Sequence, residues 1–119
     1  MQDFRPVFIE LRKIMQPYGR KLVVKTDSDT EYYVNTPHIQ KNKSPLFFGA
    51  VQTKKGFVSY HLMPIYMKPE LLASTSAELK AKMQGKSCFN FKTVEAGLLK
   101  ELAALTKAGF ESYQSDGYV

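Results

Sequence analysis

Apolar residues recur every three or four positions at the start of the chain, which is the spacing of one face of a helix: Phe4, Val7, Phe8, Leu11, Ile14 and Met15. Asp3 can cap the first free amides of such a helix, and Pro6 fits its first turn. Pro17 and Gly19 then end the pattern. These residues predict an amphipathic first helix.

The next segment changes to strict alternation of apolar and polar residues, the period of a half-buried strand. Residues 21–25 and 31–35 alternate around the polar tip 27–30, and residues 46–53 and 57–63 alternate around a turn at 54–56. A polar loop at 37–44 separates the two pairs. The pattern predicts two hairpins in succession.

Helical signals return after residue 70. Thr75 with Glu78 three positions later has the form of a capping box, and Gly85 stands where a helix end favours a left-handed residue. A short helix from Ser76 to Gln84 is therefore predicted, followed by a strand from Lys86 to Phe91.

A last helix is predicted after Thr93, which can cap it. Its apolar face comprises Val94, Leu98, Leu99, Leu102 and Leu105. Gly109 is expected to end this helix, and residues 112–119 are expected to form a frayed tail.

This order of elements predicts one α+β domain over residues 1–119, a mainly antiparallel sheet of about five strands with helices packed on one face. Ten apolar residues share the inward phase of their elements and should form one core: Phe4, Phe8, Leu11, Tyr60, Leu62, Phe89, Phe91, Leu98, Leu102 and Leu105. The other face of the sheet is left available.

Strand alternation also places chemically useful side chains on that second face. His61 alternates with Tyr60 and Leu62, while Cys88 and Asn90 alternate with the phenylalanines of the later strand. Lys86 has the same phase as Cys88, and Tyr33 joins from the first hairpin. We expect His61, Lys86 and Cys88 to border one concave pocket.

Composition and charge narrow the classes of function. The net charge is +6, but the seventeen basic residues are spread from Arg5 to Lys107 and never exceed two in a row, which argues against a nucleic-acid partner. The longest apolar runs, such as Leu46–Val51, are far too short to span a membrane. The single Cys88 cannot form an intramolecular disulfide, which favours a reducing, cytoplasmic location.

Several runs resemble the YdhG-like family of small bacterial domains of unknown function, whose wider membership includes proteins described as frataxin-like iron chaperones. They are FFGAV at 47–51, VSYHLMPIY at 58–66, MQGKSCFNFK at 83–92 and LAALTKAGF at 102–110. The resemblance covers nearly the whole chain. It implies a frataxin-like α+β fold and a bacterial cytoplasmic origin, and it implies no established catalytic residue.

Two alternatives follow from the resemblance and from the reactive side chains. Iron delivery needs grouped oxygen ligands, whereas the first helix offers only Asp3 and Glu10 against three basic residues, so no metal ligands are assigned. An enzyme would use Cys88 as nucleophile and His61 as base, with Lys86 lowering the pKa of the thiol. A lone strand cysteine more often behaves as a small hydrophobe, and no catalytic residue is assigned.

The prediction is therefore a non-enzymatic module that binds a small anionic ligand or a protein partner on the exposed sheet face. Its site residues are Tyr33, His61, Lys86, Cys88 and Asn90. Lys86 would hold the anion, Tyr33 would form an aromatic wall, and Asn90 with His61 would orient the ligand. The aromatic content would also suit a homodimer interface. The sequence does not identify a cofactor.

Overall fold

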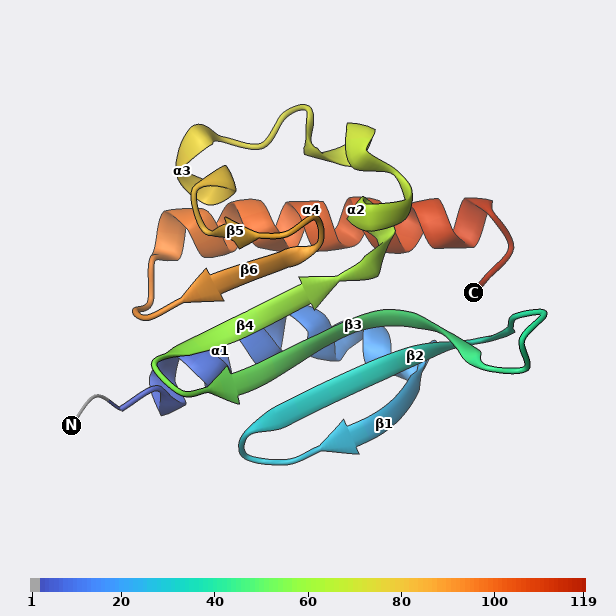
Figure 1. Cartoon of the computed structure of the whole chain (residues 1–119), viewed down its shortest axis with the longest axis horizontal. Coiled ribbons are helices and arrows are strands. Elements are labelled where there is room, and N and C mark those ends of the chain that lie inside the picture. Colours follow the sequence, from blue (N-terminus) through green and yellow to red (C-terminus); the bar gives the residue numbers. More distant parts are fainter. Residues whose placement is uncertain (1–2) are drawn as a thin grey trace.

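A six-stranded antiparallel sheet organises the computed structural model, which describes residues 3–119. Its strands lie in the order β1-β2-β3-β4-β6-β5, and both edges are open (Figure 1). The strands are β1 Val23–Asp27, β2 Glu31–Ile39, β3 Pro45–Lys54, β4 Phe57–Leu62, β5 Met83–Gln84 and β6 Cys88–Phe91. The predicted α+β class is confirmed. The sheet has one strand more than predicted, β5, which is formed by residues expected to end a helix.

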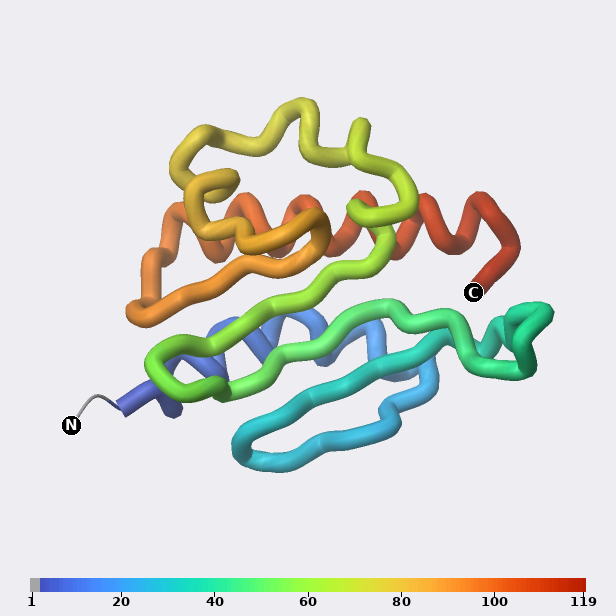
Figure 2. Tube along the Cα trace, in the orientation of Figure 1, coloured from blue at the N-terminus to red at the C-terminus, as the bar shows by residue number. Residues whose placement is uncertain are grey.

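Two long helices, α1 Arg5–Met15 and α4 Ala96–Ser115, lie behind the sheet in the view of Figures 1 and 2. Shorter helical segments connect the strands: η1 Gln16–Arg20, α2 Met63–Met67, η2 Pro69–Leu72 and α3 Ala77–Lys80. The predicted cap of α1 is displaced by one residue. Phe4 occupies the N-cap position, and Asp3 accepts a hydrogen bond from the Arg5 amide at 3.0 Å.

The core lies between the sheet and these two helices, as the alternation predicted. Eight of the ten predicted core residues belong to one buried cluster, and Phe4 and Leu98 pack against its margin. Phe89 is fully buried whereas Cys88 is half-buried, so the predicted phase of β6 is confirmed. Inside the core, the Tyr60 and Thr106 hydroxyls are 2.7 Å apart, and Thr106 donates to the Leu102 carbonyl at 2.8 Å.

The helix predicted from Ser76 to Gln84 is shortened to α3, and its predicted cap is wrong by one residue. Ser76, not Thr75, is the N-cap, and its hydroxyl accepts a hydrogen bond from the Leu79 amide. The Ser76 amide and hydroxyl donate to the Glu101 carboxylate of α4 at 2.9 and 2.7 Å. The chain then pairs with β6, because the Asn90 amide donates to the Lys82 carbonyl.

The last helix does not end at Gly109 but continues to Ser115, into the segment expected to fray. Gly109 allows α2 to approach α4: a Cβ at this position would lie 3.0 Å from the Pro64 Cβ. Tyr113 is buried, and its hydroxyl donates to the Phe47 carbonyl at 2.9 Å. Tyr118 packs against the rings of His38 and Tyr113. Tertiary contacts therefore hold the segment 112–119.

A bulge in β3 interrupts the alternation at Phe48. Val34 pairs with Gly49 and Asn35 pairs with Phe47, so one extra residue, Phe48, is inserted into β3. Phe48 is fully buried, and a Cβ at Gly49 would lie 2.7 Å from the His61 carbonyl oxygen and 2.5 Å from the Met15 Cε. The bulge thereby turns Phe47 to the uncovered face.

Among residues 3–119, no helix combines the length and the apolar character needed to cross a bilayer.

Candidate functional site

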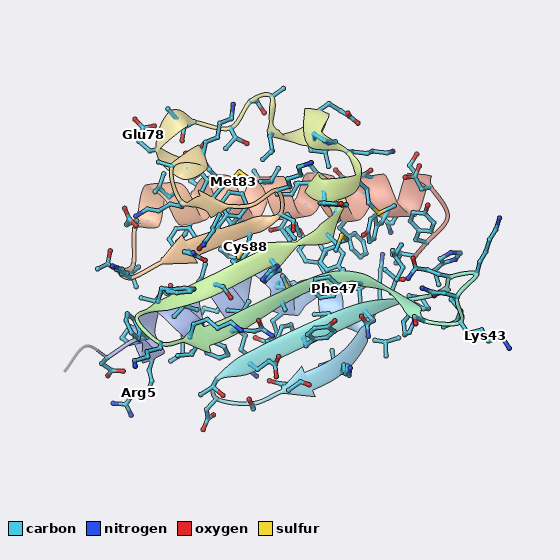
Figure 3. The ribbon with its side chains drawn as sticks, in the orientation of Figure 1. Arg5, Lys43, Phe47, Glu78, Met83 and Cys88 are labelled. Carbon is cyan, nitrogen blue, oxygen red and sulfur yellow. The ribbon has the colours of Figure 1, made fainter. Side chains whose placement is uncertain are left out.

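The face of the sheet opposite α1 and α4 carries a transverse row of side chains from four strands. Tyr33 of β2 pairs with Ala50 of β3, Ala50 with His61 of β4, and His61 with Cys88 of β6. Figure 3 shows this face toward the viewer, with Phe47 and Cys88 labelled on neighbouring parts of the sheet. Direct pairing places the side chains of this row on the same side.

Three rings form what we call the aromatic patch: Tyr33, Phe47 and His61. The Tyr33 and Phe47 rings are stacked, with centroids 4.8 Å apart and an interplanar angle of 29°. The His61 ring lies 6.4 Å from that of Phe47 and is tilted by 58°. All three side chains are partly exposed, so an aromatic surface remains open to a ligand.

Two lysines lie on the same face as the aromatic patch or against it. The Lys25 Nζ lies 5.2 Å from the centroid of the Tyr33 ring, within the range of a cation–π interaction. Lys54 projects from the same face of β3 as Ala50, because the two residues differ by four positions without an intervening bulge. Its positive charge contributes to the pKa changes of both His61 and Cys88.

A second transverse row, Glu31, Gln52, Ser59 and Asn90, lies beside the aromatic patch. Gln52 donates from its amide to the Glu31 carboxylate. Asn90 donates to the Gln84 side-chain oxygen at 2.6 Å and accepts a hydrogen bond from the Cys88 thiol at 3.5 Å. These bonds fix the orientation of the Gln52 and Asn90 side chains.

Cys88 and His61 are cross-strand neighbours, but their protonation does not match a nucleophile and its base. Burial raises the pKa of the Cys88 thiol above its ordinary value, although Lys54 and a backbone bond from Tyr60 lower it. Burial and then the charge of Lys54 lower the pKa of His61. Both groups are therefore neutral near pH 7, whereas a reactive cysteine requires a stabilised thiolate. The thiol bonds to Asn90, and the enzyme hypothesis gains no support.

Lys86 lies apart from the other four predicted site residues. It is exposed in the turn between β5 and β6 and lines a cavity of about 340 Å³ together with Ile65 and Met83. Neither His61 nor Cys88 lines that cavity. The cation whose charge acts on both groups is Lys54, so the pKa-lowering role that the enzyme alternative gave to Lys86 gains no support.

The strand pattern thus brings together Tyr33, His61, Cys88 and Asn90 on one face, but it missed Phe47 and Lys54. Strict alternation cannot place Phe47, because the bulge reverses the phase within β3. The available signal was the glycine that follows two consecutive phenylalanines, since an isolated glycine in a strand pattern often marks a bulge.

Within residues 3–119, no three His, Cys, Asp or Glu side chains come together as ligands for a metal ion. No family model, curated protein or solved structure matches the chain. The resemblance to the YdhG-like family therefore stays a prediction.

The surroundings of His61 lead to a test by pH. Replacing Lys54 with methionine is expected to raise the pKa of His61, because it removes the positive charge that disfavours the imidazolium, while burial continues to lower it. A titration of the imidazole signals by NMR measures the change. Lys55→Met, at the next residue, is the matched control and should leave the pKa of His61 in place. Equal shifts in both variants would contradict the effect assigned to the Lys54 charge.

The same pKa predicts the direction of acid destabilisation. The pKa of His61 in the folded protein lies below its ordinary value of 6.5, so protons bind more readily to the unfolded chain. The corresponding stability is complete above pH 6.5 and is lost as the pH falls through the lowered pKa. Urea unfolding at several pH values should show this loss in the wild type and less of it in His61→Gln.

Proposed function

We propose that this chain is a non-catalytic binding module that holds a small, planar, anionic molecule on the aromatic patch. One observation carries the proposal: three partly exposed rings lie on an uncovered sheet face, with Lys25 against the Tyr33 ring and the charge of Lys54 acting on His61. Aromatic faces attract planar ligands, and nearby ammonium groups favour those with negative charge. A cytoplasmic location and kinship with the YdhG-like family belong to the same proposal, supported by the lone cysteine and by the sequence runs quoted above.

Because burial and Lys54 lower the pKa of His61, its imidazole is neutral near pH 7 and the positive charge near the patch comes from the lysines. Neutral His61 has one nitrogen that donates and one that accepts a hydrogen bond, so it can orient a polar group at the ligand edge. In the row from Glu31 to Asn90, Gln52 bonds to Glu31 and Asn90 bonds to Gln84, so the row serves as a fixed polar border. The lysines would therefore contact the negative charge of the ligand, and Tyr33 and Phe47 would stack on its planar part.

Calorimetric titration with AMP and with 4-hydroxybenzoate, two anions of different size that each carry a planar ring, tests the proposal. At least one should bind and raise the unfolding temperature, whereas inorganic phosphate, which has no planar part, should bind more weakly. Phe47→Ala should weaken binding at least about five-fold, the scale of a lost stacking contact. Tyr66→Ala is the matched control, because Tyr66 is a 54% exposed aromatic residue of α2 whose ring is in none of the ring contacts of the patch.

Two outcomes would overturn the proposal. One is the absence of binding by both planar anions. The other is a wild-type chain that self-associates in sedimentation while Phe47→Ala is monomeric, because the patch would then be an interface between copies of the chain.

A further inference from the structure

A second region of the molecule combines an unfilled cavity with a lysine that makes no ion pair. The cavity, of about 340 Å³, lies where the β5–β6 turn approaches α2 and η2 (Figure 1). It is lined by Ile65, Pro69, Leu72, Met83, Gly85 and Lys86. None of these residues belongs to the aromatic patch, so the cavity is a separate place for a ligand.

The walls of the cavity are mainly apolar. Ile65 is almost fully buried, while Leu72 and Met83 are only partly buried, although both pack against the hydrophobic core. Their remaining accessible surface faces a space that the protein does not fill. Covering such surface with an apolar group is favourable in proportion to the area removed from water.

Lys86 supplies a positive charge at this cavity. Lys86 takes part in none of the ion pairs that Arg5, Arg12, Lys13, Lys68 and Lys82 make with carboxylates. Its side chain is exposed, so its ammonium group is hydrated and can exchange water for an anion. An exposed lysine is a flexible point charge, which suits a single carboxylate better than a rigid two-pronged contact.

Gly85 keeps the turn beside Lys86 open. Its φ of +77° lies in the left-handed region that favours glycine, and an added Cβ would meet no atom within 4 Å. The backbone at this point therefore borders open space, which leaves a way into the cavity next to the lysine. At 340 Å³ the cavity is at the small end of the range for ligand sites, so the ligand must be small.

We propose that this cavity binds a small monocarboxylate with an apolar tail, the tail against Ile65, Leu72 and Met83 and the carboxylate at Lys86. Apolar walls alone would select only for the tail. The unpaired ammonium selects for the acid over an alcohol or an amine of the same length. This site is independent of the aromatic patch, and it gives Lys86 the anion-binding role expected from the sequence at a different location.

Hexanoate, hexan-1-ol and hexylamine, titrated separately, test the proposal. The probe is the NMR signal of the Met83 ε-methyl group, identified by its loss in Met83→Leu. Hexanoate should shift this signal and bind about three- to five-fold more tightly than hexan-1-ol, the scale of one exposed ion pair, and hexylamine should bind most weakly. Lys86→Gln should abolish the preference for the acid while leaving the weaker binding of the alcohol.

Lys80→Gln is the matched control, because Lys80 is an exposed lysine of α3 that does not line the cavity, and its preference should equal that of the wild type. Equal affinity for acid and alcohol, or an unchanged preference in Lys86→Gln, would overturn the assignment of the charge. Absence of any shift at Met83 with all three compounds would overturn the site itself. Phe47→Ala should leave the hexanoate titration unchanged, which separates this result from failure at the aromatic patch.

Discussion

Replacing Leu102 with alanine is expected to lower the free energy of unfolding by about 2–5 kcal/mol. Leu102 is fully buried on the face of α4 that packs against the sheet, where its side chain belongs to the same cluster as Tyr60 and Phe89. Truncation would remove apolar burial and leave a cavity that a close-packed interior only partly collapses. Urea denaturation at constant m-value measures the loss.

Leu98→Ala is the matched control for this variant. Leu98 is on the same helix, four residues earlier, but it is only partly buried at the margin of the core. The same chemical change should therefore cost less. Equal losses in the two variants, or an unchanged midpoint in Leu102→Ala, would show that the centre of the core is misplaced.

Replacing Gly49 with alanine is expected to cost about 1–3 kcal/mol, the usual penalty of overpacking. The added Cβ would lie 2.7 Å from the His61 carbonyl oxygen, which is backbone of the paired strand and has little freedom to move, and 2.5 Å from the flexible end of Met15. The rigid contact makes the change unfavourable even if Met15 finds another rotamer. Thermal and urea unfolding measure the cost.

Gly97→Ala provides a control with the opposite sign. A Cβ at Gly97, in the first turn of α4, would meet no atom within 4 Å. Alanine should stabilise this helix by up to about 1 kcal/mol, because it restricts the unfolded chain. If Gly49→Ala had the same effect as Gly97→Ala, the close approach of β3 to β4 and α1 would be wrong.

Local periodicity was sufficient to predict which side chains lie between the sheet and the helices. The alternation in β4 and β6 assigns Tyr60, Leu62 and Phe89 to the core and leaves His61 and Cys88 on the other face, as the structure has them. Such patterns succeed because each strand satisfies the same rule, one face buried and one not, independently of its partners.

The errors arise where tertiary contacts overrule a local signal. Gly109 is a good helix stop in sequence, yet here it makes room for Pro64. Thr75 and Glu78 have capping-box spacing, but Ser76 is the N-cap, held there by its hydrogen bonds to the Glu101 carboxylate of α4, a helix distant in sequence. Phe47 lies on the face of the candidate site only because the bulge reverses the phase of β3. Lys86 lies outside the site because it is in a turn, where strand alternation does not apply.

Because α4 covers one part of the inner face of the sheet, the core is completed only after α4 has been synthesised. Residues Leu102, Leu105, Phe110 and Tyr113 of α4 close the core that α1 and β1–β4 begin. During translation the first four strands are made before α4, so their inner apolar face has no cover on that side for the time needed to add residues 63–115. The nascent chain is therefore most exposed to aggregation just before its final helix emerges, and slowing synthesis in that stretch should increase its dependence on chaperones.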